Sequence, residues 1–376
     1  MILAALRGTV ASWRENRYVL QAERTLLERM DLGTTSDGRD IRLWRISSAD
    51  GLTAEITNIG ACLVSLYARD AHGQLKDVVL GRPCVADYAC NPLFFGAVIG
   101  RNANRTAGAC FELGSIRYEL GVNEPPNNNH SGPNMWHERV WDCVSASDSH
   151  VTLALQSPDG DQGYPGAVSV RVTYELVDAN ALAITYEGSP SAQTIMNLTN
   201  HSYFNLNGCD SGSALGHSLQ VQASLYTECD EHSIPTGRLL PVAGTPFDFS
   251  EPRALGEALA ASGTPAAGLD LNYAVWDFAH TSDGSVGALR RAATLVGDTS
   301  GIALDVWCDT PGLQVYTANF IEGASGKGGV TYHARDAVCL ETQFFPDAIH
   351  HSEFEQPVFG PDRPYRSRTV FAFRCV

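Results

Sequence analysis

The chain has 376 residues, of which 44% are hydrophobic and only 18% are charged, so it can bury a large core. Its formal net charge of −16 argues against binding to nucleic acids or anionic membranes, because phosphate contacts need clustered Lys and Arg. No segment reaches the roughly 18 consecutive apolar residues that a membrane span requires.

The ten cysteines occur singly and include no Cys-x-x-Cys pair, so their spacing does not support a zinc or iron–sulfur site. Such scattered thiols fit a reducing compartment. The first residues show no basic segment before a long apolar run, which a secretory signal would have. We therefore expect a cytoplasmic protein.

The N-terminal region differs in pattern from the rest of the chain. Its apolar residues recur at helical spacing, and Gly33 follows them as a helix C-cap often does: Val19, Ala22, Leu26 and Met30. The pattern predicts an amphipathic helix over Trp13 to Asp31, within a helical extension of residues 1–33. It would pack on the main domain or form a subunit contact. A mis-assigned start site is the alternative.

From about Ile41 onwards the apolar period changes from helical spacing to two. Apolar and polar residues alternate over 168–176, and the same pattern over 151–155 and 182–186 predicts further half-buried strands. Residues 111–118 read as a hairpin around Gly114-Ser115. With 35 Gly and 18 Pro marking turns, residues 34–376 are predicted to form one large antiparallel β-sandwich, so the fold class is all-β.

The segment Asn200 to Leu206 surrounds His201 with asparagine, serine and tyrosine side chains. This density of neutral hydrogen-bonding groups suits a polyhydroxylated ligand. Histidine has an ordinary pKa of about 6.5, so His201 could transfer a proton near neutral pH. A histidine held in a structural polar network is the alternative.

The apolar run 337–340 reads as a buried strand that ends at Glu341. We expect Glu341 to emerge where this strand leaves the core, with its pKa raised because burial disfavours the charged form. Such a carboxylate can act as a general base. A salt-bridge partner at a strand end is the alternative.

Together these segments resemble the aldose 1-epimerases, the galactose mutarotase family, from about Asp40 to the C-terminus. Seven motifs occur in the family's order and spacing: 100–105, 127–133, 157–166, 200–206, 268–273, 311–316 and 340–348. The resemblance implies a galactose-mutarotase-type β-sandwich with its site in a groove on the concave face.

The resemblance also implies the reaction, which interconverts the α and β anomers of free aldohexoses such as galactose and glucose. Ring opening needs a base on the anomeric hydroxyl and an acid on the ring oxygen. Glu341 occupies the position of the family's base and His201 that of its acid, and we expect them on opposite sides of the ring. No electron or group is transferred, so no cofactor is expected.

Further sugar contacts follow from the same resemblance: Asn104, Arg105, His130, Tyr203, Asp270 and Gln314. Arg101 is expected to brace a loop. Ser131 and Leu271 depart from the family pattern, where a glycine and often a histidine stand. We expect the sugar to be the binding partner, and the protein to be a monomer or a homodimer.

Three rival functions remain at this point. A sugar-binding module without catalysis would have lost Glu341 or His201, and both are present. A glycoside hydrolase could use Asp270 and Glu341 as a carboxylate pair. A sugar-phosphate epimerase would need extra cationic groups, and near His130 and His201 only Arg139 offers one.

Overall fold

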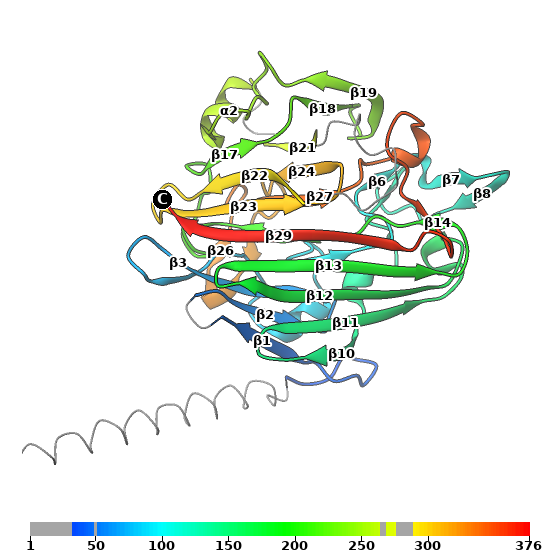
Figure 1. Ribbon diagram of the computed structural model, residues 1–376, viewed down its shortest axis with the longest axis horizontal. Coiled ribbons are helices and arrows are strands. Elements are labelled where there is room, and N and C mark those ends of the chain that lie inside the picture. Colours follow the sequence, from blue (N-terminus) through cyan, green and yellow to red (C-terminus); the bar gives the residue numbers. More distant parts are fainter. Residues whose placement is uncertain (1–31, 49–50, 264–267, 276–288) are drawn as a thin grey trace, which may run out of the picture.

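The computed structural model describes residues 32–48, 51–263, 268–275 and 289–376, and antiparallel strands dominate them (Figure 1). The largest sheet has nine strands in the order β10 (Asp142–Ala146), β11 (His150–Ser157), β12 (Val168–Asp178), β13 (Ala181–Pro190), β29 (Tyr365–Cys375), β23 (Ile302–Cys308), β22 (Arg290–Val296), β17 (Ser218–Val221) and β20 (Arg253–Ala254). The six-stranded sheet runs β16 (Tyr203–Phe204), β27 (Val338–Gln343), β24 (Gly312–Tyr316), β21 (Asp270–Ala274), β18 (Leu225–Cys229) and β19 (Pro235–Pro241).

Smaller sheets and short helices complete the fold. A four-stranded sheet joins β1 (Leu43–Ser47), β2 (Thr53–Thr57), β3 (Leu63–Arg69) and β4 (Leu75–Asp77). Five pairs join β5 (Ala97–Ile99) to β15 (Thr199–His201), β6 (Arg105–Thr106) to β9 (Asn128–Asn129), β7 (Cys110–Leu113) to β8 (Ile116–Glu119), β14 (Thr194–Ile195) to β28 (Val358–Phe359), and β25 (Ala324–Ser325) to β26 (Thr331–Tyr332). The α-helix α2 (Leu255–Ala261) is short. Among the described residues no helix is long and apolar enough to cross a membrane.

The predicted all-β fold and its individual strands are confirmed. β11, β12 and β13 contain the three alternating segments, and the inward residues of β12 are buried while the residues between them are more exposed. The hairpin β7–β8 turns through Gly114, whose φ of +63° favours glycine. The predicted helix at Trp13 to Asp31 lies outside the described residues.

The main core lies between the nine-stranded and six-stranded sheets. Val315 and Leu340 of the six-stranded sheet belong to the same buried cluster as Leu304 and Phe371 of the larger one. The rings of Phe204 and Phe371 meet at 5.0 Å. This packing covers one face of the six-stranded sheet, so functional side chains must stand on the other face.

Strand β27 shows how alternation separates these two faces. Val338 and Leu340 belong to the main core, whereas Cys339 belongs to a second buried cluster on the opposite side. Glu341 lies on the side of Cys339, because side chains two apart share a face. The strand continues to Gln343, so the prediction that Glu341 stands at its end is wrong. The ladder to β24 continues beyond the apolar run because backbone hydrogen bonds do not require apolar side chains.

Candidate active site

Strand register brings the first group of predicted residues together. Glu341 on β27 pairs with Gln314 on β24, and Tyr316 on β24 pairs with Asp270 on β21. All four share the face that points away from the main core. Gln314 Nε2 donates to Asp270 Oδ1 at 2.6 Å. Residues distant in sequence thus form one polar row.

His201 reaches this row from β15, which pairs with β5. Its Nε2 lies 3.8 Å from Glu341 Oε1, and its Nδ1 lies 3.6 Å from the thiol of Cys339. Phe94 stacks on the imidazole with a centroid distance of 5.6 Å. The ring therefore has a fixed orientation, with one nitrogen directed at the carboxylate.

His130 stands beside His201, with 5.7 Å between the ring centroids. Its Nδ1 accepts a hydrogen bond of 3.1 Å from the backbone N–H of Asn104. Burial holds the pKa of His130 well below 6.5, so the ring is neutral at physiological pH. Because Nδ1 is an acceptor, Nε2 carries the proton and His130 can donate one hydrogen bond to a ligand.

These residues line a pocket of about 180 Å³. Drug-sized ligands occupy pockets of roughly 300–1,000 Å³, so this one suits a smaller molecule. Seven of the eight predicted site residues line it, and Gln314 stands behind Asp270: Asn104, Arg105, His130, Tyr203, His201, Asp270 and Glu341. The remaining lining residues were not predicted: Pro92, Leu93, Phe94, Asn129, Tyr316 and Phe320.

Some of the pocket-lining residues that were not predicted could have been found from the sequence pattern, and others could not. Tyr316 is two residues beyond Gln314 in an alternating strand, so the period of two already places it on the same face. Phe94 and Phe320 lie in loops, where no periodicity predicts direction. Phe320 is 74% exposed at the pocket wall, and its backbone N–H donates to the hydroxyl of Tyr316 at 3.1 Å.

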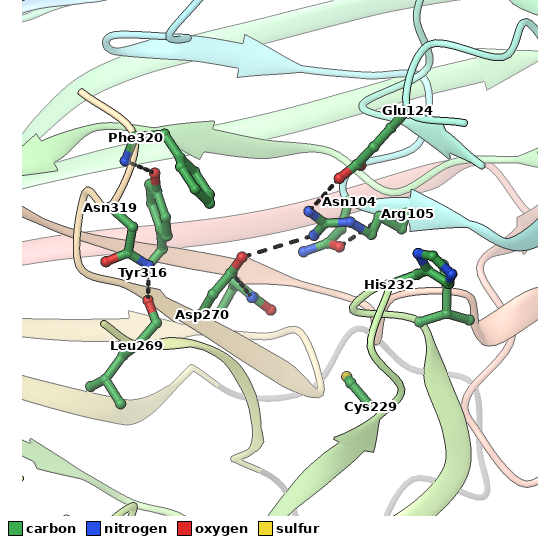
Figure 2. A network of polar contacts seen from close by, with 12 residues as sticks. Asn104, Arg105, Glu124, Cys229, His232, Leu269, Asp270, Tyr316, Asn319 and Phe320 are labelled. Atoms are coloured by element: carbon green, nitrogen blue, oxygen red, sulfur yellow. Dashed lines mark hydrogen bonds and ion pairs between the residues drawn. The ribbon is translucent and has the colours of Figure 1, made fainter. Parts of the chain in front are cut away.

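Arg105 lies between two carboxylates, as Figure 2 shows. Its guanidinium donates to Glu124 at 2.8 Å and lies 3.9 Å from Asp270. The backbone N–H of Arg105 donates to Oδ1 of Asn104, whose φ of +62° is left-handed. Asparagine tolerates this conformation better than most residues.

Burial controls the protonation of the central pair. It raises the pKa of Glu341 well above 4.5, with a further rise from the charge of Asp270 and an opposing effect of Arg105. It lowers the pKa of His201 to about 3. Burial therefore favours a protonated Glu341 and a neutral His201, because neither charge is solvated. Burial thus disfavours the protonated form of His201, which an acid needs before it can donate a proton.

Several buried polar atoms have no hydrogen-bond partner within the described part of the chain. Three belong to residues that line the pocket (Arg105 Nε, Asn129 Oδ1 and Glu341 Oε2), and two belong to residues hydrogen-bonded to that lining (Glu124 Oε2 and Gln314 Oε1). An unsatisfied buried polar group costs about 1–3 kcal/mol. A ligand rich in hydroxyl groups would supply both donors and acceptors to these atoms.

The two departures from the family pattern have structural explanations. Ser131 adopts a φ of +59°, and its hydroxyl both accepts from Asn102 N at 2.8 Å and donates to Asn102 O at 2.9 Å. Leu271 packs against the main core, on the opposite side of β21 from Asp270. Neither side chain lines the pocket.

Comparison with known proteins agrees with this geometry. The sequence profile of the family described as aldose 1-epimerase matches residues 42–372. The human galactose mutarotase is 36% identical over 90% of this chain and 95% of its own length, and the Escherichia coli aldose 1-epimerase is 32% identical over 90% and 96%. The solved structure of a GalM/aldose epimerase homologue from C. elegans has a TM-score of 0.81 at 28% identity, covering 89% of this chain and 99% of that one. The chain belongs to the aldose 1-epimerase family.

Proposed function

We propose that this chain catalyses mutarotation of free aldohexoses such as galactose and glucose, with Glu341 as base and His201 as acid. One observation carries the proposal beyond family membership: a buried carboxylate and an imidazole lie 3.8 Å apart in a small pocket. Both groups transfer protons, and the surrounding orphan polar atoms suit sugar hydroxyls.

The reaction moves one proton through the pair. Glu341 takes the proton of the anomeric hydroxyl while His201 protonates the ring oxygen, and the bond from C1 to that oxygen breaks as the aldehyde forms. Rotation about the C1–C2 bond and the reverse transfers close the ring on the other face. Ring opening therefore converts a charged pair into an uncharged one.

The burial of both groups favours the proton distribution that ring opening produces. A protonated Glu341 and a neutral His201 are the forms that desolvation stabilises. Sugar hydroxyls that donate to Glu341 would stabilise its charged form before the reaction. The pair therefore holds one proton in both states: on His201 before the ring opens and on Glu341 afterwards.

The separation of the pair corrects one expectation. No sugar ring fits between groups 3.8 Å apart, so Glu341 and His201 do not stand on opposite sides of the ring. The anomeric oxygen and the ring oxygen are bonded to the same carbon, and two groups side by side on one wall can reach both.

The other pocket residues would bind and orient the sugar. His130 offers its Nε2–H, Asp270 accepts from hydroxyls, and Arg105 donates. Asn104, Tyr203 and Gln314 complete the set through amide and hydroxyl groups. The mechanism needs no cofactor. We further propose a cytoplasmic location and a monomer or homodimer.

Polarimetry tests the function directly. Freshly dissolved α-galactose and α-glucose should reach their equilibrium rotation faster with the protein than without it. Dialysis against a strong chelator should leave the rate unchanged. Unaltered relaxation of both sugars would contradict the proposal, and release of a chromogenic aglycone would favour a glycoside hydrolase instead.

A further inference from the structure

One charged side chain next to the pocket, that of Glu124, is not used by the proposed mechanism. Glu124 accepts the hydrogen bond of Arg105 at 2.8 Å, and Figure 2 shows it on the side of the guanidinium opposite Asp270. Glu124 does not line the pocket itself, and its Oε2 is buried without a partner. It can therefore act on the sugar only through Arg105.

The backbone around Glu124 is restrained. Glu124 and Asn127 exchange two backbone hydrogen bonds of 2.7 and 3.2 Å across Pro125-Pro126. Proline fixes φ near −65°, so this turn has little conformational freedom. The side chain of Asn127 also accepts from the N–H of Gly108 at 3.0 Å. The carboxylate is thus presented from a rigid turn.

The two carboxylates differ in how they hold Arg105. The bond to Glu124 is a charge-assisted hydrogen bond, whereas the 3.9 Å to Asp270 exceeds hydrogen-bond length. Asp270 is instead tied to Gln314 at 2.6 Å through Oδ1. A guanidinium held this way keeps its distance from Asp270. Arg105 can then donate to sugar hydroxyls between the two groups, and Asp270 can accept from them.

We propose that Glu124 is a positioning residue that holds Arg105 away from Asp270 and so keeps both groups available to the sugar. The inference rests on the proposed mutarotase function. Without Glu124, Arg105 would close on Asp270 as a salt bridge, and the sugar would have to break that pair to bind. The loss should therefore appear in the Michaelis constant and not in the turnover number.

Kinetics of Glu124→Ala and Glu124→Gln on α-galactose test this role. We expect Glu124→Ala to raise KM roughly threefold to tenfold with kcat within about twofold of the wild type. Glu124→Gln keeps an oxygen acceptor for Arg105 and should recover part of the loss. Glu119→Ala is the matched control, because Glu119 accepts from Arg117 at 2.6 Å on an exposed hairpin.

A double-mutant cycle separates positioning from direct contact. In an Arg105→Met background, Glu124→Ala should change KM by less than about twofold, because the group it positions is gone. An undiminished effect there, or a KM of Glu124→Ala equal to that of Glu119→Ala, would overturn the inference. If Glu124→Ala does not fold, Glu124→Gln enters the same cycle. An inactive wild type would instead refute the proposed function.

Discussion

Two arginines only four residues apart stand in contrasting surroundings. Arg101 is fully buried, and its terminal nitrogens donate to neutral oxygens of Ser157, Pro165 and Gly166 at 2.6–2.9 Å. Arg105 lines the pocket and lies between two carboxylates. Arg101 therefore braces loops, as the sequence analysis predicts, whereas the proposed function assigns Arg105 to sugar binding.

The pKa shifts express the same contrast. Burial lowers the pKa of Arg101 to about 10, because nearby charges only partly compensate the lost solvation. Burial acts on Arg105 in the same direction, yet the hydrogen bond to Glu124 and the charges of Asp270 and Glu124 raise its pKa above the ordinary value of an arginine. The pKa of a buried arginine thus falls where its neighbours are mainly neutral oxygens, as around Arg101, and rises where carboxylates hold it, as at Arg105.

The largest effect should follow from changing the pocket's base. Glu341→Gln keeps the shape and hydrogen-bonding capacity of the side chain but cannot take a proton. Turnover in the polarimetric assay should fall by ~10²–10⁴-fold. Retention of more than about half of the wild-type rate would exclude Glu341 as the base.

The proposed acid should give a similar but separable loss. His201→Asn retains a hydrogen-bonding group and removes proton transfer to the ring oxygen, so kcat should fall about 10²-fold, more than KM rises. Steady-state rates over a range of α-glucose concentrations separate the two constants. A change confined to KM would make His201 a binding residue.

The arginine contrast can be tested by matched substitutions. Arg101→Met leaves buried carbonyl and hydroxyl oxygens unpaired and should lower the free energy of unfolding by about 2–4 kcal/mol, with near-normal kcat and KM per folded molecule. Arg105→Met should raise KM about tenfold or more and cost less stability. Denaturant unfolding and kinetics measured on both variants check the assignment, which reversed outcomes would refute.

The buried Glu341 should also lower the free energy of unfolding, by an amount that depends on pH. The folded pKa of Glu341 is raised, so the unfolded chain ionises first, and this group's contribution falls as pH rises from 4.5 towards the folded pKa. Glu341→Gln removes the effect and should stabilise the fold at about pH 8, with little change near pH 4.

Burial shifts the pKa of His201 downwards, opposite to that of Glu341. Its pKa of about 3 means that its contribution is present above 6.5 and is lost as pH falls towards 3. Both the wild type and Glu341→Gln retain His201, so its contribution should largely cancel in their difference. Thermal unfolding of both proteins across pH measures the difference, and a constant difference would refute the predicted burial effect.

The smallest kinetic effect should come from the N-terminal segment. The family match begins at residue 42, and every pocket residue lies beyond it. Deletion of residues 1–29 should leave turnover per folded molecule within about twofold of the full chain, while the melting temperature or oligomeric state changes. A folded truncation that binds sugar without interconverting anomers would show that this segment supports catalysis.

The sequence by itself determined the β-rich fold and most of the pocket. Alternation over 168–176 is a local property of the chain, so it predicted a strand without knowledge of its neighbours. The family motifs identified Glu341, His201 and six further residues, and the structure brings all eight together. From the sequence alone, Leu271 and Ser131 could be identified as departures from the family pattern, but their structural reasons could not be given.

Only the tertiary structure decided how these groups act on one another. The 3.8 Å between Glu341 and His201, the placement of Phe320 and the position of Glu124 beside Arg105 depend on strand register, loop conformation and sheet packing. The protonation of the pair also depends on burial by elements remote in sequence. Periodicity is set by neighbouring residues, whereas distances and desolvation are set by the whole fold.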